Sequence, residues 1–236
     1  MKCYPLLSLA VLTLVACDHA AEPETPTDES LAVRRGRILA GYELIELGSL
    51  GGEFSHAEAI NERGQIVGLS YTASDELHAF LWEAGVMADL NVPGPAVAND
   101  ISNAGSVTGW YGLGYAKRPF LWRRGVTIDL GALVTDCGSF GQAVSNRGQV
   151  VGYSETVCGG GHAGGYSEDH AVLWNRGEMV DLHSAEVDAF SHLSRAYGIN
   201  NRGQVVGYLG QGSPRAVLWE KGRTVLLGTL ATAYYP

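Results

Sequence analysis

The chain has 236 residues and a formal net charge of −9, because 25 acidic residues outnumber 16 Lys and Arg residues. An acidic chain with no basic stripe argues against nucleic acid as a partner. The part that carries repeats is about 195 residues long, which is the size of one domain.

Residues 1–16 have the features of an export signal. Lys2 gives a positive start, and an apolar stretch follows from Pro5 to Val15. This stretch is too short to span a bilayer, which takes about 20 residues. The letters Leu-Val-Ala-Cys that end at Cys17 resemble the bacterial lipobox, which implies that Cys17 becomes the lipid-bearing N-terminus after cleavage.

The segment 17–40 is predicted to be a disordered tether behind the lipidated Cys17, because it is polar, acidic at first and contains proline. Such a chain spans roughly 25–30 Å, and several acyl chains anchor stably at about 0.8 kcal/mol per buried CH₂. We therefore expect a lipoprotein of the bacterial cell envelope, membrane-anchored and facing the periplasm or the exterior. The alternative is an ordinary secretion signal that is cut near Ala20 or Ala21.

The rest of the chain is dominated by four copies of one two-part phrase. The first half reads, for example, AVSNRGQVVG at 143–152, and the second reads HAVLWNRGEMVDL at 170–182. The copies are marked by the glycines Gly68, Gly109, Gly152 and Gly207 and by the tryptophans Trp82, Trp122, Trp174 and Trp219. The glycines are 41, 43 and 55 residues apart, and a period in the forties is typical of a repeat array.

Each half of a repeat is predicted to be a β-hairpin. Asn or Ser followed by Gly makes a tight corner, and the short apolar runs are rich in Val, Ile, Trp and Tyr. Each repeat is therefore four short antiparallel strands, the make-up of a β-propeller blade. We predict an all-β fold over 41–230, a propeller of about four blades, followed by a C-terminal tail at 231–236.

The number of predicted strands does not by itself decide whether the blades close into a ring. YELIEL at 42–47 resembles the fourth strand of a repeat, so it is predicted to be a surplus first strand. Either four blades close a small ring, or the array is incomplete, or its open edge pairs with another copy.

The repeats also resemble a known family. His78-Ala79-Phe80 followed by Leu81-Trp82, together with the Asn-x-x-Gly-Gln-Val-Val-Gly phrase, is similar to the extracellular HAF-repeat family of bacteria over about 42–230. The resemblance implies a secreted or surface-associated repeat protein and no particular reaction. Arg118 and Arg215 depart from it, because they stand where His78 and His170 stand in the other copies.

The four repeated tryptophans are expected to pack between neighbouring blades, where each ring supplies about 150–250 Å² of contact. Stacking on a sugar is the alternative. Trp110 lies outside this series and is the freer candidate for binding.

Of the four cysteines, Cys137 and Cys158 are predicted to form a disulfide, because both fall in connections on the same side of the third repeat and the protein is exported. Free thiols are the alternative. Closing this loop contributes roughly 3 kcal/mol in the chain-entropy model.

Motifs for catalysis are weak. Residues 159–164 match G-x-G-x-x-G, but no helix follows to bind a phosphate. Cys158, His162 and His170 lie near Glu168 and Asp169, yet the predicted disulfide argues against a zinc site. We expect no cofactor, no metal and no catalytic residue. Asp89, Asp129 and Asp181 recur near the end of strand four, where they are expected to bind a turn or neighbouring backbone.

Long, variable connections gather at one face of the predicted array, and loops held by a rigid scaffold are the usual place for binding. They span 69–77, 91–97, 110–117, 131–141, 153–169, 183–195 and 208–214. The candidate ligand-binding residues there are Tyr71, Trp110, Tyr111, Tyr115, Phe140 and Tyr166.

We therefore expect a non-catalytic protein that binds an envelope or extracellular protein or polysaccharide. The first alternative is a polysaccharide hydrolase or lyase using acidic loop residues such as Asp75, Glu76, Glu168 and Asp169. The second is a structural array that assembles through its edge strands.

Overall fold

The computed structural model describes residues 43–158, 168–183, 193–210 and 214–228 of the chain. The predicted signal 1–16, nearly all of the segment before the repeats, and the tail 231–236 lie outside these residues. The described part is all-β, with sixteen strands and no helix, and so it offers no helix that could cross a membrane.

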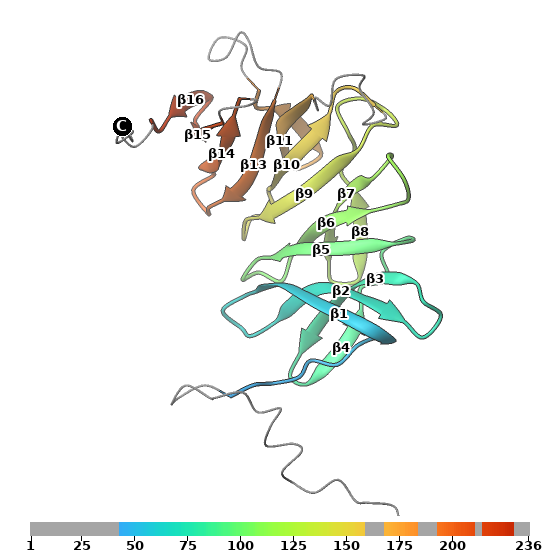
Figure 1. Cartoon of the computed structure of the whole chain (residues 1–236). Coiled ribbons are helices and arrows are strands. Elements are labelled where there is room, and N and C mark those ends of the chain that lie inside the picture. The colour runs from blue at the N-terminus through green and yellow to red at the C-terminus, as the bar shows by residue number, and fades with distance from the viewer. Residues whose placement is uncertain (1–42, 159–167, 184–192, 211–213, 229–236) are drawn as a thin grey trace, which may run out of the picture. The chain divides into compact units, whose positions relative to one another are not determined.

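The strands form four antiparallel sheets of four strands each, which we call sheets 1 to 4 in chain order (Figure 1). Sheet 1 contains β1 (Gly51–Ile60), β2 (Ile66–Thr72), β3 (Leu77–Glu83) and β4 (Val86–Asp89); sheet 2 contains β5 (Ala96–Ile101), β6 (Val107–Tyr111), β7 (Arg118–Arg123) and β8 (Val126–Asp129); sheet 3 contains β9 (Ser139–Val144), β10 (Val150–Glu155), β11 (Asp169–Asn175) and β12 (Glu178–Asp181); and sheet 4 contains β13 (Ser194–Ile199), β14 (Val205–Leu209), β15 (Arg215–Glu220) and β16 (Arg223–Leu226).

The predicted repeat of four antiparallel strands is confirmed, but the predicted surplus strand is wrong. Residues 43–47 form no strand, and Leu44 and Ile45 are 71% and 61% exposed. A fourth strand needs the free edge of a third strand. In sheet 4 that edge is already taken, because Val217 in β15 pairs with Leu226 in β16.

The Asn-x-x-Gly-Gln phrase folds into a tight corner between the first two strands of each sheet. In sheet 1, Oδ1 of Asn61 accepts the backbone N–H groups of Arg63 at 3.0 Å and Gln65 at 3.1 Å. Gly64 has a φ of 74°, which an L side chain would strain. In sheets 2 and 3 the hydroxyls of Ser102 and Ser145 accept the equivalent N–H, so Asn and Ser are interchangeable here.

The repeated glycine on the second strand is required by a bulge on the first. Each first strand carries one extra residue opposite this position. The bulge brings a carbonyl oxygen against the glycine: a Cβ at Gly109 would lie 1.9 Å from the oxygen of Val97, and the other three sheets are alike. Only a residue without a side chain fits such an approach.

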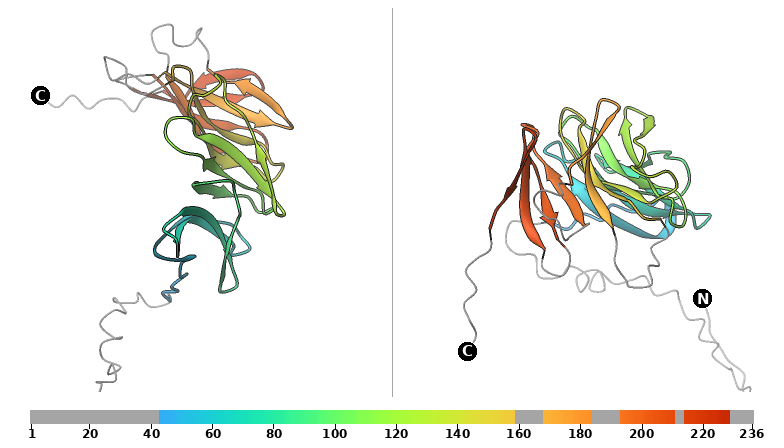
Figure 2. Two further views of the ribbon diagram at one scale, coloured as in Figure 1. Left: turned by 90° about the vertical axis from the view of Figure 1, so that its right-hand side faces the viewer. Right: turned by 90° about the horizontal axis from the view of Figure 1, so that it is seen from above.

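Consecutive sheets pack face against face, and the three hydrophobic clusters lie between them (Figure 2). Trp122, Trp174 and Trp219 each pack into the cluster between their own sheet and the one before. Trp174 and Trp219 are 3% and 4% exposed. Sheet 1 is the first sheet of the described residues, and its Trp82 is only partly buried.

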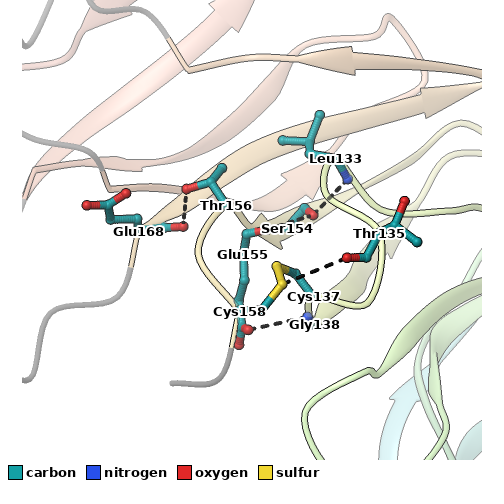
Figure 3. The surroundings of a disulfide bond; sticks show 9 residues. All are labelled: Leu133, Thr135, Cys137, Gly138, Ser154, Glu155, Thr156, Cys158 and Glu168. Atoms are coloured by element: carbon teal, nitrogen blue, oxygen red, sulfur yellow. Dashed lines mark hydrogen bonds between the residues drawn. A yellow bond between two sulfur atoms is a disulfide. The ribbon is translucent and has the colours of Figure 1, made fainter. Parts of the chain in front are cut away.

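The predicted disulfide is present. Cys137 and Cys158 are bonded, with their Cα atoms 4.6 Å apart (Figure 3). The bond ties the connection before β9 to the end of β10. Nearby, the backbone N–H of Leu133 donates to the Ser154 hydroxyl at 3.0 Å, which anchors the same connection to the same strand.

Candidate functional site

Short turns and long connections fall at opposite ends of the sheets, as the sequence predicts. The connections at 73–76, 90–95, 112–117, 130–138 and 156–168, and those after β12 and β14, share one end. Several predicted connections were drawn too long, because the second strands continue two to four residues past the repeated glycine. Tyr71, Tyr111 and Phe140 pair there with Leu77, Arg118 and Tyr153, and so belong to strands.

The six candidate ligand-binding residues do not form one group. Tyr71 in β2 meets Phe54 edge-on in sheet 1, with ring centroids 6.0 Å apart. Tyr111 in β6 packs against the cluster between sheets 1 and 2. Tyr115 stands 69% exposed in the connection at 112–117, and Tyr166 lies outside the described residues.

The two remaining candidates lie together. Trp110 in β6 meets Phe140 in β9 edge-on, with ring centroids 6.1 Å apart. These two residues come from different sheets, so the packing of sheet 3 on sheet 2 brings them together. Both are partly buried near the end that carries the long connections.

Further rings and two cations extend this pair across sheets 3 and 4. Phe140 stacks on Tyr153 with centroids 4.9 Å apart, and the Arg195 guanidinium lies 4.4 Å from the Tyr153 centroid. At the other end, the Lys117 ammonium lies 4.0 Å from the Trp110 centroid. Tyr197 and Tyr208 stack on each other at 5.9 Å in sheet 4. We call these residues the aromatic row: Trp110, Phe140, Tyr153, Tyr197 and Tyr208, with Lys117 and Arg195.

Only Trp110 and Phe140 of the aromatic row were predicted from the sequence. The signal that could have found it is the position directly after the repeated glycine, which holds Leu69, Trp110, Tyr153 and Tyr208 in the four copies. Three of these four residues are aromatic, and sheets 1, 2 and 3 each have a different residue at this position. Phe140 was named from the sequence, whereas Tyr197, Lys117 and Arg195 are recognisable only from their contacts.

A buried ion pair fixes the cation at the centre of the row. Asp169, at the start of β11, is only 1% exposed, and its Oδ2 accepts a hydrogen bond of 2.7 Å from Nε of Arg195. Burial alone would lower the pKa of Arg195, but the charge of Asp169 and its hydrogen bonds outweigh burial and raise that pKa. The second oxygen, Oδ1, is buried without a hydrogen-bond partner among the described residues.

Tyr153 lies beside this pair, and its phenol stays neutral over a wide pH range. Burial is the largest cause that raises its pKa, to about 12, and the charge of Arg195 opposes that shift. The phenol is therefore uncharged at physiological pH. The row thus presents aromatic rings, the Lys117 ammonium over Trp110 at one end, and the Arg195 guanidinium paired with Asp169.

In sheets 1 to 3 a side-chain hydrogen bond to an Asp joins the third strand to the fourth. Nδ1 of His78 lies 2.6 Å from Oδ2 of Asp89, and the same contact recurs between Arg118 and Asp129 and between His170 and Asp181, each at 2.7 Å. The other oxygen of each Asp accepts a backbone N–H two residues on, as expected. His and Arg alternate at this position because both can donate to the carboxylate.

The hydrogen bonds outweigh burial at two of these carboxylates. Burial raises the pKa of Asp129, but the hydrogen bond from Arg118 and the backbone N–H of Gly131 bring it below its ordinary value. The pKa of Asp181 is lowered for the same reasons by His170 and His183. These aspartates therefore stabilise their sheets through hydrogen bonds to neighbouring side chains and backbone.

The acidic residues named for an enzyme are divided between two sheets. Asp75 and Glu76 lie in the turn between β2 and β3, while Glu168 and Asp169 precede and begin β11. The carbonyl of Glu168 accepts hydrogen bonds from Thr156 (Figure 3), and Asp169 is held by Arg195. Within the described part of the chain, no group of three or more His, Cys, Asp and Glu is placed to hold a metal; His162 lies outside it.

Several hollows lie away from the row. Two of them, about 260 and 250 Å³, open between the outer strands of consecutive sheets. One is lined by Leu173 and Trp219, and the other by the equivalent residues Leu121 and Trp174. A hollow that recurs at equivalent repeat positions is a consequence of how the sheets pack, and we assign no ligand to it.

Comparison with known proteins adds no identification: no protein-family model, no curated protein and no solved structure matches the chain.

Proposed function

We propose that the protein is a non-catalytic binding protein of the bacterial cell envelope, held to a membrane through a lipid on Cys17. It binds a polysaccharide or protein partner at the aromatic row and the long connections beside it. The single observation that carries the proposal is the row itself, in which five rings and two cations gather across three sheets.

The row has the composition of a recognition surface. Trp, Tyr and Arg provide most of the binding energy in protein interfaces, and their rings add contact area at a low cost in entropy. Most row positions also differ from copy to copy, unlike the residues that each sheet needs to fold; Tyr153 and Tyr208 are the exception, since both follow the repeated glycine. Because the five rings and Arg195 stand on paired strands, their positions are fixed before a partner arrives.

The chemistry of the row favours a partner with apolar faces and a negative group. The CH-rich faces of sugars pack on aromatic rings, and the Lys117 ammonium at one end can pair with a carboxylate. Acidic polysaccharides are therefore the first probes to use. A protein partner would place apolar side chains against the rings and an acidic side chain at Lys117.

We propose that the four sheets are blades of a β-propeller of the HAF-repeat kind. Three features support this: the sheets follow one another in chain order, they pack face against face, and the first strands of consecutive sheets lie beside each other. In a propeller the first strand of each blade is the innermost, which would place the row near the axis.

The compartment follows from the N-terminal sequence and the cysteines. The lipobox-like letters that end at Cys17 support membrane anchoring, and the polar segment 17–40 would hold the sheets away from the headgroups. The Cys137–Cys158 disulfide suits an oxidising compartment such as the periplasm or cell exterior.

The experiment is a glycan array probed with the protein, followed by titration of each hit with wild type, Trp110→Ala and Phe54→Ala. Phe54 is the matched control, because it is a 50% exposed ring on β1, away from the row. We expect binding without product release, lost in Trp110→Ala and kept in Phe54→Ala. Release of shortened sugars, or equal binding by the two variants, would refute the proposal.

A further inference from the structure

Each junction between sheets joins two different faces. We call the face that packs on the next sheet the forward face and the one that packs on the preceding sheet the backward face. The forward face of sheet 1 presents Ala59, Val67 and Leu81, which pack in one cluster with Trp122 from the backward face of sheet 2. The same four positions meet again between sheets 3 and 4, where Ala143, Val151, Leu173 and Trp219 share a cluster.

The forward face of sheet 4 has no cover within the described residues. Val206 is 46% exposed, whereas the equivalent residues Val67, Thr108 and Val151 are all 0% exposed. Ala216 is exposed, whereas the equivalent Ala171 is 0% exposed. Apolar positions that are fully buried in three sheets are therefore open in the fourth.

The backward face of sheet 1 is open at Ala57 and Ile60, although Phe80 on the same face is 0% exposed. Ala57 is exposed, whereas its equivalents Ala98 and Ala196 are 0% exposed. Ile60 is 65% exposed, whereas its equivalent Ile101 is 5% exposed. Among the described residues, one forward face and part of one backward face are thus uncovered.

The two open faces have complementary shapes. Gly198, Val206 and Leu218 line a hollow on the forward face of sheet 4. The equivalent positions of sheet 3 are Ala143, Val151 and Leu173, and there Trp219 covers them. The residue equivalent to Trp219 on the backward face of sheet 1 is Trp82, which is partly exposed. Trp82 is therefore the ring that fits this hollow.

Hydrogen bonds also join the corner between the first two strands of each sheet to the same corner of the next sheet. Oδ1 of Asn103 accepts the Glu62 N–H at 3.0 Å, Oδ1 of Asn146 accepts the Ala104 N–H at 3.2 Å, and Oδ1 of Asn201 accepts the Asn146 N–H at 2.9 Å. Each corner thus donates to the next one. The corresponding acceptor in sheet 1 is Glu62, whose exposed carboxylate can accept the Asn201 N–H of a neighbouring corner.

We propose that the forward face of sheet 4 binds the backward face of sheet 1 of a second copy of this chain. In Figure 1 and in the left view of Figure 2, sheets 1 and 4 lie at opposite ends of the series, so the open faces of one chain do not meet each other. The contact continues the junction that already occurs three times within the chain. Because it joins two different faces, it builds a closed ring or a filament of copies.

The test is a cysteine cross-link between corners in the full chain. Chains with Asn201→Cys and chains with Glu62→Cys, carrying different tags, are expressed together and mildly oxidised. The proposal predicts a covalent dimer that contains both tags, and none when either variant is replaced by the parent chain. Glu62→Cys with Asn103→Cys in one chain is the positive control, because those corners are joined by a 3.0 Å hydrogen bond.

A second variant separates assembly from folding. Val206→Asp places a charge on the open face and should lower the cross-linked fraction at least tenfold with little change in the melting temperature. Val126→Asp is the matched control, because Val126 is 60% exposed on β8, away from both open faces. The proposal is wrong if Glu62→Cys and Asn201→Cys, placed in the same chain, form a disulfide within that chain. It is also wrong if only the positive control cross-links.

Discussion

Replacing Gly109 by Ala tests the structural reason for the repeated glycine. The added Cβ would lie 1.9 Å from the carbonyl oxygen of Val97, and ordinary contact begins at 3.4 Å, so the two strands must separate by about 1.5 Å. Separation breaks the pairing of Ala98 with Gly109 beneath the cluster between sheets 1 and 2. We expect a loss of about 3 kcal/mol or more in the free energy of unfolding.

The matched control is Gly125→Ala. Gly125 lies in the turn between β7 and β8 with a φ of 83° and open space around its Cα, so Ala there suffers only backbone strain of about 1–2 kcal/mol. Denaturant unfolding of wild type and both variants gives the three free energies. If Gly109→Ala costs no more than Gly125→Ala, the carbonyl contact does not explain the glycine.

Reducing the Cys137–Cys158 bond, or replacing both cysteines by Ala, should lower stability by about 3 kcal/mol for a loop with a separation of 21 residues; an unchanged unfolding midpoint under reductant would contradict this. Stability should also fall as pH rises from about 10 to about 12, because the pKa of Tyr153 is raised in the folded protein and the unfolded state releases its proton first. Tyr153→Phe should flatten that fall, and an identical pH profile would count against burial as the cause. Asp129→Asn breaks the partly exposed pair with Arg118 and should cost no more than about 1 kcal/mol by thermal unfolding, so a much larger loss would mean that the pair is not a surface interaction.

The repeated phrase predicts the secondary structure well because the turn residues of each copy determine its hairpins locally. Asn61 and Gly64 specify a corner whatever the sheet is packed against, and the same holds for Asn200 and its glycine. The surplus strand was predicted wrongly for a non-local reason. A strand needs a free edge to pair with, and residues 42–47 do not reveal that the edge in sheet 4 is already occupied.

The candidate site was less predictable than the fold, because it depends on how one sheet is set against the next. Trp110 and Phe140 were named from the sequence, but nothing in their spacing shows that their rings meet. Arg195 and Asp169 are 26 residues apart and join only through the packing of sheets 3 and 4. Tyr153 was predicted to begin the connection 153–169, whereas it lies in β10, and its position after the repeated glycine was a usable signal.

The measurement that tests the central claim most directly is the affinity of the purified protein for its best-binding glycan or partner protein, compared between wild type and Trp110→Ala. Removing the ring that joins Lys117 to Phe140 should weaken binding at least tenfold, as for an aromatic residue at the centre of an interface, while the unfolding midpoint stays close to that of wild type. Equal affinity in the two proteins would show that the partner does not bind at the aromatic row.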